Sequence, residues 1–518
     1  MCKKLIALLM TGIMCISMTA CGSNQGDQKA EATENNASGE TAGAAKDTLN
    51  VVVDSDVGNM GPFGSGTSFS YLAPQVYEAM FELGYEMEVT PRLAEKWDKI
   101  DDTHYTFYLR QGVEFSDGNK MTADDVIFSL NLYTQDANYG RYVEHVDFEK
   151  TKAIDDYTVD LYFKEENAFA FSQLAGVRII SEESWNASPD QMVTDPVGTG
   201  PYKLQEYVSG SYFTLEANEK YWGGAPDIKT VKFTVTSEPS QRTTALETGE
   251  ADLVMNLQAS DVEYMNNKEG FTVIQDITVQ SMSMFFNMND ASVFSNKELR
   301  QALCYAVDNS AINVAAYGGF CEPSKTYFST AMMDYTDDME SAIYSVDKDK
   351  AKELFGASGV NGGNIRIATD GTTQETSIAE ILQSELTQYG FTVQIDNYDP
   401  ATIWSVGADP TQWDILLMLG SAPSGYGLDK MTAFLTGLNF SRWKGEKFDE
   451  FTELCVEASS TADEAKRLDY TKQALEIVSE EVPAYSFIQN VQNYAYVDNL
   501  NFKVWNQASL YVKDLKFE

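Results

Sequence analysis

Helix patterns in this chain run straight into strand patterns, and this alternation limits the folds that the chain can adopt. Across residues 378–389 apolar side chains recur at helical spacing, Gly390 supplies a C-terminal stop, and apolar residues then alternate with polar ones over 391–395. A second helix is expected to start from the capping box of Ser295 and Glu298. Further strand patterns lie at 104–110, 157–163 and 231–235. Such units predict an α/β protein with helices packed on sheets.

An apolar run near the N-terminus has the features of an export signal. Two lysines precede the uncharged segment 5–18, which is too short to cross a bilayer stably as a helix. We therefore expect residues 1–20 to be a signal peptide. This segment ends in Met-Thr-Ala directly before Cys21, which resembles a lipobox, so Cys21 is expected to carry a lipid (palmitate) anchor. An ordinary secreted protein cut near Ala20 is the alternative.

The segment after Cys21 lacks side chains that can bury surface. Residues 22–47 consist only of Gly, Ser, Asn, Gln, Asp, Glu, Lys, Ala and Thr, a composition that does not form a packed core. We expect residues 21–47 to be a disordered tether with a coil span on the order of 25 to 30 Å. The folded body then begins after this segment.

The body is too long for a single hydrophobic core. It holds about 470 residues, which predicts two or three domains. The whole chain has 37 basic and 78 acidic residues and a formal net charge of −41 at pH 7. Cleavage of the signal removes Lys3 and Lys4 and makes the mature chain more acidic still. Nucleic acid is therefore disfavoured as a partner.

The cysteines do not suggest a disulfide framework. Two of the six leave with the signal, and a third, Cys21, receives the lipid. The remaining three, Cys304, Cys321 and Cys455, cannot all pair with one another. Cys304 stands among apolar helix positions and is typical of a small core residue, although a bridge to Cys321 stays open.

Catalytic motifs are absent from the sequence. The two histidines, His104 and His145, stand far apart and without a motif around either. The chain has no Gly-x-Ser-x-Gly elbow, no His-Glu-x-x-His and no phosphate loop. In the loop 58–66, Ser65 stands where a calcium loop needs its bidentate glutamate. We therefore predict no catalytic residue, no metal site and no cofactor, and binding is the better first hypothesis.

Several segments, taken in order, resemble a known family. They begin with TPRLAEKW at 90–97, YTFYLRQGVEFSDG at 105–118 and TADDVIFS at 122–129. Further segments follow at 196–202, 218–224, 245–252, 286–287, 299–303, 305–308, 351–354, 413–418 and 480–483. Together they are similar to bacterial extracellular solute-binding protein family 5, which includes the oligopeptide-, dipeptide- and nickel-binding lipoproteins of ABC importers. The resemblance covers nearly the whole mature chain.

This resemblance implies a two-lobed periplasmic-binding-protein fold of type II, cluster C, with an extra N-terminal subdomain. By analogy, lobe I takes residues 48–82, 195–285 and 482–518, the extra subdomain 83–194, and lobe II 286–481. Hinge crossings are expected near Phe286 and Glu481.

The mechanism that the family implies is capture and not catalysis. A ligand enters an open cleft and makes more contacts after the lobes close. The closed form, a monomer, then docks on the permease subunits of an ABC importer. The expected location is the outer face of the cytoplasmic membrane, which the protein contacts through its lipid anchor only.

One departure from the family pattern bears on the ligand. In peptide-binding members an aspartate that pairs with the peptide α-ammonium commonly follows the segment equivalent to 413–418. Here the chain reads Leu419-Gly-Ser-Ala-Pro-Ser-Gly-Tyr426, and the nearest aspartate is Asp429. A buried ammonium without a carboxylate partner is costly. A peptide remains the leading ligand, oligosaccharide is the competitor, and nickel is disfavoured because histidine is nearly absent.

Six residues are candidate ligand contacts. Asn59 and Phe63 lie in the first loop, and aromatic platforms with neutral hydrogen-bonding groups, as sugars need, are available later in the chain. The full set is Asn59, Phe63, Trp404, Ser421, Ser424 and Tyr426. Trp404 is equally compatible with a core position.

Two functions of a different class remain as alternatives. One is a secreted hydrolase, and the other is a sensory lipoprotein without a permease.

Overall fold

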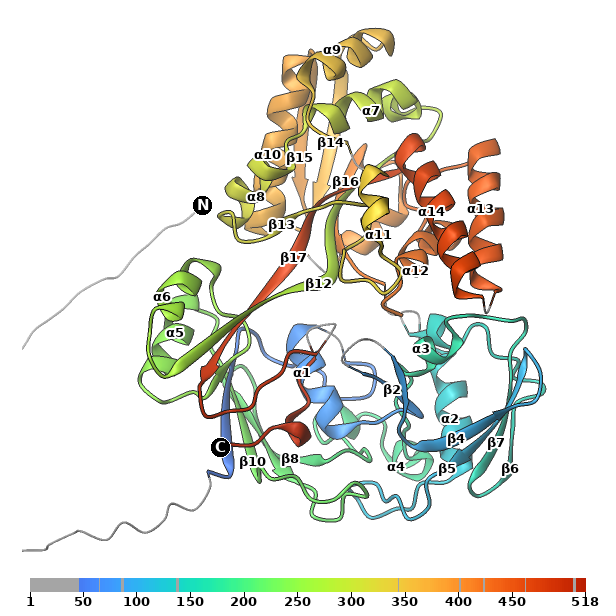
Figure 1. Ribbon diagram of the computed structural model, residues 1–518, viewed down its shortest axis with the longest axis vertical. Coiled ribbons are helices and arrows are strands. Elements are labelled where there is room, and N and C mark those ends of the chain that lie inside the picture. Colours follow the sequence, from blue (N-terminus) through green and yellow to red (C-terminus); the bar gives the residue numbers. More distant parts are fainter. Residues whose placement is uncertain are drawn as a thin grey trace, which may run out of the picture. The chain divides into compact units, whose positions relative to one another are not determined.

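The computed structural model (Figure 1) describes residues 46–518, apart from 65, 85–87, 137–138, 343, 400–401, 423, 462 and 506–508. The signal over 1–20, Cys21 and nearly all of the predicted tether over 21–47 lie outside the described residues. Within the part of the chain that the structure describes, no helix combines the length and the apolar character needed to span a membrane.

One large mixed sheet carries most of the strands. Its eleven described strands run in the order β15-β14-β16-β12-β17-β11-β1-β10-β9-β8, and β13 pairs with β17 off this path. Their bounds are β1 (Thr48–Val53), β8 (Tyr202–Val208), β9 (Tyr212–Ala217), β10 (Thr230–Val235), β11 (Leu253–Val254), β12 (Phe271–Phe286), β13 (Glu322–Pro323), β14 (Gly363–Thr369), β15 (Phe391–Asn397), β16 (Ile415–Gly420) and β17 (Ala484–Val497). The strands β14 and β15 pair in parallel, as the helix between them requires.

Two smaller sheets and the helices complete the fold. The strands of the smaller sheets are β2 (Phe81–Leu83) and β3 (Val89–Pro91), then β4 (Ala94–Lys99), β5 (His104–Leu109), β6 (Lys152–Asp155) and β7 (Thr158–Tyr162). The helices are α1 (Thr67–Val76), α2 (Ala123–Tyr133), α3 (Ala170–Leu174), α4 (Glu182–Ala187), α5 (Pro239–Glu247), α6 (Val262–Asn266), α7 (Lys297–Ala306), α8 (Asn309–Tyr317), α9 (Lys348–Ala357), α10 (Thr373–Gln388), α11 (Ile403–Ala408), α12 (Gly427–Thr432), α13 (Glu446–Ser459) and α14 (Glu464–Glu481).

Separate clusters of buried apolar residues form the cores. The lobe I core lies among α1, β1, β9, β10 and the segment after β17. The subdomain core lies among β4, β5, β7 and α2. The lobe II core lies among β14, β15, β16, α7 and α10. A further cluster between α12, α13 and α14 also contains Phe169 of the subdomain. The body therefore has more than one buried apolar cluster, and its division into two or three domains stays a prediction.

Two long strands pass through both the lobe I and the lobe II cores (Figure 1). β12 and β17 pair antiparallel along most of their length, and their register shifts between Ile277 and Ser281. On one side of this irregularity Ile274 and Tyr494 pack with the lobe I core, and on the other Met284 belongs to the lobe II core. Because a bulge leaves the ladder locally unpaired, this is the place where the strand pair can bend.

The domain boundaries and the hinge crossings near Phe286 and Glu481 stay predictions. Phe286 itself ends β12 and is fully buried in the lobe II core, while Glu481 ends α14 directly before β17. The register shift lies nearer the middle of β12 than Phe286 does.

Most of the predicted elements are confirmed. α10 is followed by Gly390, whose φ of 86° only glycine adopts readily, and then by β15. The strand patterns at 104–110, 157–163 and 231–235 correspond to β5, β7 and β10. The mixed α/β class follows from these units.

The capping box predicted for Ser295 and Glu298 is wrong. The backbone N–H of Leu299 donates to the side chain of Asn296 at 2.9 Å, so Asn296 is the N-cap of α7. Ser295 instead closes the preceding 3-10 turn, where its hydroxyl donates to the carbonyl of Ser292 at 2.8 Å. The pattern missed the cap by one residue because both side chains satisfy the same rule.

The three cysteines within the described residues are free thiols. Cys304, Cys321 and Cys455 are all buried, and the bridge between Cys304 and Cys321 that the sequence left open is not formed. Burial raises the pKa of each thiol. These cysteines are therefore small core residues, poorly suited to thiolate chemistry.

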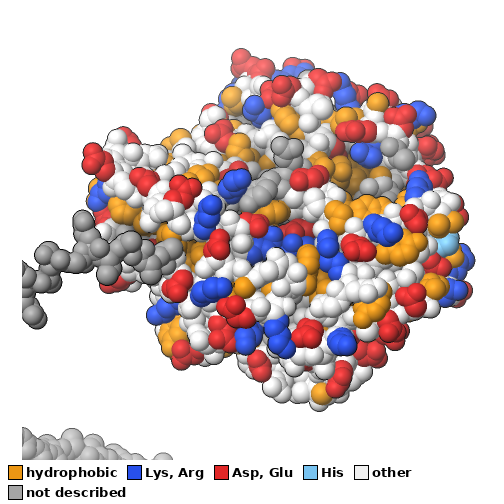
Figure 2. All heavy atoms as spheres, turned by 60° about the horizontal axis from the view of Figure 1, so that its bottom comes forward, with side chains coloured by type: hydrophobic (Ala, Val, Ile, Leu, Met, Phe, Trp, Pro, Cys, Tyr) orange, Lys and Arg blue, Asp and Glu red, His pale blue; other side chains and the backbone are white. Residues whose placement is uncertain are grey.

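The negative charge is mixed with positive charge on the surface. Figure 2 shows Lys and Arg side chains interspersed among Asp and Glu side chains across one face of the protein. The acidic residues still outnumber the basic ones over the whole chain, 78 against 37, so the protein stays strongly acidic.

Candidate ligand-binding site

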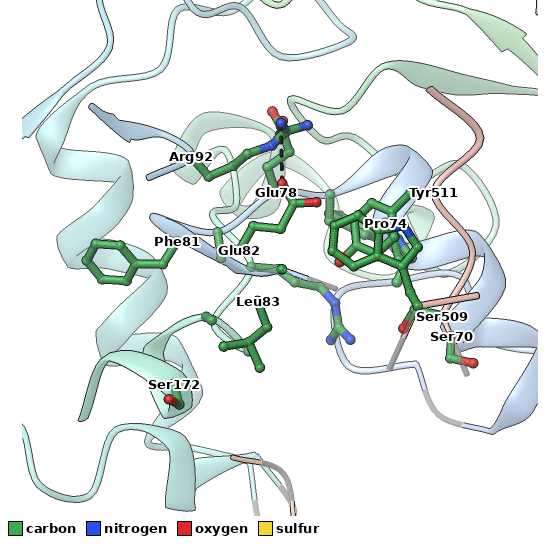
Figure 3. A pocket seen from close by; sticks show the side chains of 18 of the residues that line it. Ser70, Pro74, Glu78, Phe81, Glu82, Leu83, Arg92, Ser172, Ser509 and Tyr511 are labelled. Atoms are coloured by element: carbon green, nitrogen blue, oxygen red, sulfur yellow. Dashed lines mark ion pairs between the residues drawn. The ribbon is translucent and has the colours of Figure 1, made fainter. Parts of the chain in front are cut away.

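A cavity of about 240 Å³ lies among α1, β2, α3 and the segment that follows β17 (Figure 3). Pro74 of α1, Leu83 of β2, Ser172 of α3 and Tyr511 of the C-terminal segment line it. The segment after β17 is fastened to α1 because the backbone N–H of Val512 donates to the side-chain oxygen of Gln75 at 3.0 Å. Residues far apart in sequence therefore build one concave surface.

In the wall of the cavity, the buried carboxylate of Glu78 joins several of the sequence segments that resemble family 5. Glu78 is 6% exposed and forms an ion pair with Arg92 Nε at 2.8 Å. Its carboxylate also accepts hydrogen bonds from Thr199 Oγ1 at 2.9 Å, Tyr221 Oη at 2.7 Å and Trp222 Nε1 at 2.9 Å. These partners come from the segments at 90–97, 196–202 and 218–224. The Glu78 carboxylate is thus fully engaged by the protein.

Glycines allow these segments to come close. A Cβ on Gly198 or Gly200 would collide with the carbonyl groups of Val76 and Gln75 at the end of α1. The Gly-Thr-Gly segment therefore positions Thr199 beside Glu78 through close backbone packing, which only glycine permits.

A second carboxylate in the cavity wall is only half engaged. Glu82 Oε2 pairs with Arg92 Nη1 at 3.3 Å (Figure 3), but Glu82 Oε1 is buried and has no hydrogen-bond partner among the described residues. The side chain of Glu82 is 11% exposed. Burial raises the pKa of this carboxyl group, and the nearby Arg92 opposes that rise. Glu82 is therefore a half-satisfied carboxylate in the wall of the cavity.

A guanidinium in the same wall lacks a carboxylate partner. Arg178 is partly buried, lines the cavity and donates from Nη1 to the carbonyl of Pro62 at 2.6 Å. Its guanidinium lies 4.8 Å from the ring centroid of Phe69 and 5.6 Å from that of Tyr139. Among the described residues, no Asp or Glu oxygen forms an ion pair with it. Arginine carries five N–H donors, so donors remain for a ligand.

The cavity lies next to a contact between the subdomain and lobe II. Tyr142 lines the cavity; burial raises the pKa of Tyr142, and the charge of Asp429 in α12 adds to the shift. Phe169 of the subdomain packs 4.7 Å from the ring of Tyr426, and Ala168 N donates to Ser459 O at 2.8 Å. The residues of this contact, Phe169 and Ala168 on one side and Tyr426 and Ser459 on the other, do not themselves line the cavity.

Three of the predicted contact residues belong to the segment that forms this contact. Ser424 is fully buried, and its hydroxyl donates to Asp429 Oδ2 at 2.8 Å. Tyr426 is partly buried against Phe169. Ser421 is exposed at the end of the preceding strand. The structure therefore brings Ser424 and Tyr426 to the subdomain contact.

The other three predicted contacts lie elsewhere. Asn59 is exposed, and its side-chain oxygen accepts from Gly61 N at 2.8 Å. Phe63 packs against aromatic rings of the subdomain, with centroids 5.1 Å from Tyr133 and 5.8 Å from Tyr139. Trp404 is 50% exposed on α11, so it is not a core residue. None of the six lines the cavity, and their ligand role stays a prediction.

Glu82 and Arg178 are the site residues that sequence reasoning missed. Each is a single charge inside an apolar stretch, Phe81-Glu82-Leu83 in one case and Val177-Arg178-Ile179 in the other. A lone charge inside such a stretch is a signal, because burying it requires a partner. The sequence could not show that both lie in one cavity.

Comparison with known proteins settles the family. The family model "Bacterial extracellular solute-binding proteins, family 5 Middle" matches residues 88–441. This chain belongs to that family. The Dipeptide-binding protein of Escherichia coli strain K12 is 27% identical over 463 residues, which cover 82% of this chain and 85% of that protein. The Oligopeptide-binding protein AppA of Bacillus subtilis strain 168 is 24% identical over 551 residues, covering 98% of each chain.

A solved structure agrees at the level of the fold. The dipeptide-binding protein from Pseudoalteromonas sp. SM9913 in complex with Met-Leu superposes with a TM-score of 0.77 at 21% identity, covering 91% of this chain and all of that one. The predicted type II periplasmic-binding-protein fold is confirmed. As a member of this family the chain is a solute-binding protein of the extracellular or periplasmic class.

Metal binding has no support within the described residues. No group of three or more His, Cys, Asp and Glu side chains in that part of the chain is placed to hold a metal ion. Burial lowers the pKa of His145 to about 4, so its imidazole is neutral and buried at pH 7.

Proposed function

We propose that this protein is the lipid-anchored binding component of an ABC importer, which captures peptides in an interlobe cleft by hinge closure and delivers them to the permease. The observation that carries the proposal is the match of residues 88–441 to family 5, in a chain whose long strands β12 and β17 join two separate buried cores. Neither a reaction nor a cofactor is needed for this role.

Closure is proposed to occur at the register shift of β12 and β17. The hinge segment carries polar groups that can exchange partners: Ser329 Oγ donates to Thr278 O at 2.6 Å, and Thr278 Oγ1 donates to Asn490 O at 3.2 Å. The contact of Phe169 with Tyr426 then forms part of the closed state. A ligand that touches both sides stabilises that state by its differential contacts.

The anchor is proposed to be Cys21. Replacing Cys21 with Ala should abolish labelling by radioactive palmitate and release the protein from the membrane, while ligand binding is kept. Cys15→Ala, a change within the signal, is the matched control and should keep the label. Label retained on C21A would show that the anchor has been misplaced.

Ligand class is tested by thermal shift with defined libraries of peptides and of oligosaccharides, after mass spectrometry of co-purified solutes. A ligand that binds only the native state raises Tm by mass action. Peptides are expected to raise it. A rise with oligosaccharides alone would replace peptide by sugar as the ligand.

Oligosaccharide is retained as the second candidate because of one aromatic surface. Trp404 is half exposed on α11, and its ring lies 6.1 Å from that of Phe440. Exposed aromatic rings are suitable platforms for sugar rings.

Two observations would favour a function of another class. Turnover of a peptide or glycoside by the purified protein would support a hydrolase, and a genome neighbourhood without permease genes would favour a sensor.

A further inference from the structure

We infer that a clasp between the subdomain and lobe II holds these two parts together without any ligand. The clasp consists of the ring contact of Phe169 with Tyr426 and the hydrogen bond from Ala168 N to Ser459 O, and none of these residues lines the cavity. The inference rests on the proposed function and names what sets the balance between the open and the closed state before a peptide arrives.

Phe169 is buried in a core that is otherwise built from lobe II and the hinge strands. Its side chain is 4% exposed, and every other buried residue described in that cluster lies within 279–484. Phe171, only two residues later, packs instead with the subdomain core, where its ring stacks 5.0 Å from that of Phe81. Because exposure of a phenylalanine ring to water is costly, the burial of Phe169 opposes separation of the subdomain from lobe II.

The subdomain holds Phe169 in the position that the clasp needs. Phe169 is the N-cap of α3, and its backbone N–H donates to the side-chain oxygen of Asn167 at 2.8 Å. The carbonyl of Phe169 accepts from Gln173 N at 2.8 Å in the first turn of the helix. These local bonds fix the backbone that carries the ring, so little conformational freedom is lost when the clasp forms.

Lobe II presents a preformed partner for this ring. Tyr426 is the N-cap of α12. The buried carboxylate of Asp334 accepts from the backbone N–H groups of Gly427 and Leu428, the latter at 2.8 Å, and so fixes the start of that helix. The guanidinium of Arg467 in α14 lies 5.6 Å from the centroid of the Tyr426 ring. All of these contacts lie within lobe II, so they do not depend on the subdomain.

The backbone half of the clasp satisfies a helix end. Ser459 is the last residue of α13, and the last carbonyl groups of a helix have no partner within it. Ala168 N donates to the Ser459 carbonyl at 2.8 Å. This bond gives the contact a direction, since the apolar packing of Phe169 alone is non-directional.

A contact that needs no ligand acts equally on all ligands. When only the closed form binds tightly, the observed dissociation constant equals the intrinsic one divided by the closed fraction of the free protein. Loss of the clasp lowers that fraction and therefore weakens the binding of every peptide by one common factor. A residue that touches the bound peptide would instead weaken different peptides to different extents.

Spin labels measure the closed fraction directly. They are attached to Glu149→Cys in the subdomain and Glu453→Cys in α13, because both positions are exposed whereas the three native cysteines of the folded body are buried. Double electron–electron resonance is recorded on the mature protein after dialysis in mild denaturant has removed co-purified solutes. The wild type should show a closed population at the distance given by the structure. Phe169→Ala should lower the ratio of closed to open protein roughly 10- to 100-fold.

Matched variants separate the clasp from a general loss of stability. Phe171→Ala removes an aromatic ring from the subdomain core and should leave the ratio of closed to open protein unchanged. Tyr426→Phe keeps the ring and should keep the clasp, whereas Tyr426→Ala should reproduce the effect of Phe169→Ala. Because the two rings act on each other, the double variant should lose less than the sum of the two single losses.

Affinity gives an independent readout of the same equilibrium. Calorimetry is run with the peptides that raise the Tm of the wild type. In Phe169→Ala the dissociation constant of each of these peptides should rise by one factor, equal to the loss of closed fraction seen with the spin labels. Phe171→Ala should leave the dissociation constants unchanged.

Each contrary result has a definite meaning. A solute-free wild type without a closed population, an unchanged closed fraction in Phe169→Ala, or an equal loss in Phe171→Ala would overturn the inference. Unequal factors for different peptides would make Phe169 a ligand contact and would overturn it too. Failure of every peptide to bind would contradict the proposed capture of peptides, while the spin-label distances would still decide whether the clasp exists.

Discussion

Glu78 and Glu82 share Arg92, yet the two carboxylates are placed for different tasks. Glu78 accepts from three donors besides Arg92, and those donors come from separate segments of the chain. Glu82 has one ion pair and one buried oxygen without a described partner. A buried charge that the protein satisfies completely holds segments together, whereas one that it leaves half satisfied lowers stability.

The largest expected effect is on stability, and it tests whether Glu78 holds the fold together more than Glu82 does. Glu78→Gln should lower the free energy of unfolding by about 3–5 kcal/mol, because Thr199, Tyr221 and Trp222 lose their charged acceptor together with the ion pair to Arg92. Glu82→Gln should change it far less, since Arg92 keeps Glu78. Denaturant unfolding of both variants gives the difference directly. Equal losses would mean that the two carboxylates are alike in role.

The pH dependence of stability tests the role of Glu82. Burial raises the pKa of its carboxyl group, and the nearby Arg92 opposes that rise. A carboxyl whose pKa is raised on folding destabilises the native state above that pKa and ceases to do so as the pH falls to its unfolded value. The free energy of unfolding should therefore fall as the pH rises through this window, and Glu82→Gln should flatten this part of the stability curve. Denaturant unfolding of the wild type and of Glu82→Gln across this range of pH checks the sign.

The smallest effect on recognition is expected for Lys430, a buried cation of lobe II. Its Nζ donates to Tyr327 O at 3.0 Å and also reaches the hydroxyls of Ser281 and Ser283, so its donors are used. It does not line the cavity. Lys430→Met should leave the relative affinities for different peptides unchanged within about threefold. A larger change would extend the recognition site to lobe II.

Lys430 should also make the stability of the protein depend on pH. Burial lowers its pKa to about 7. Between that value and the unfolded pKa of about 10.4 the unfolded state binds the extra proton, so stability should rise with pH across this window. The rise should be absent in Lys430→Met, and unfolding curves at pH 7 and pH 10 measure it. A wild type without the rise would show that Lys430 stays charged.

Local patterns were sufficient for much of the fold. The spacing that predicted α10, the stop at Gly390 and the alternation of β15 act within one stretch of chain, where periodicity and backbone freedom decide the structure. The cap of α7 shows the limit of that reasoning. Ser295 and Asn296 are both good N-caps, and the preceding turn selected Asn296.

The candidate site was harder to predict from the sequence than the fold was. Ser424 and Tyr426 were chosen for their position after the strand β16, and they do reach the subdomain contact. Phe63 was chosen as a loop aromatic, but the rings of Tyr133 and Tyr139 hold it in the subdomain. Composition and spacing cannot reveal which aromatic side chain packs and which remains exposed, because that depends on neighbours distant in sequence.

By itself, the sequence determined the α/β class, the family and the absence of recognisable catalytic motifs, since these depend on periodicity and on ordered segments. Only the tertiary structure decided that Thr199, Tyr221 and Trp222 all converge on Glu78, and that Glu82 and Arg178 line one cavity. The physical reason is that the energetic state of a buried charge depends on its partners in space. Thr199, Tyr221 and Trp222 stand more than a hundred residues from Glu78 in the sequence, and folding alone brings them together.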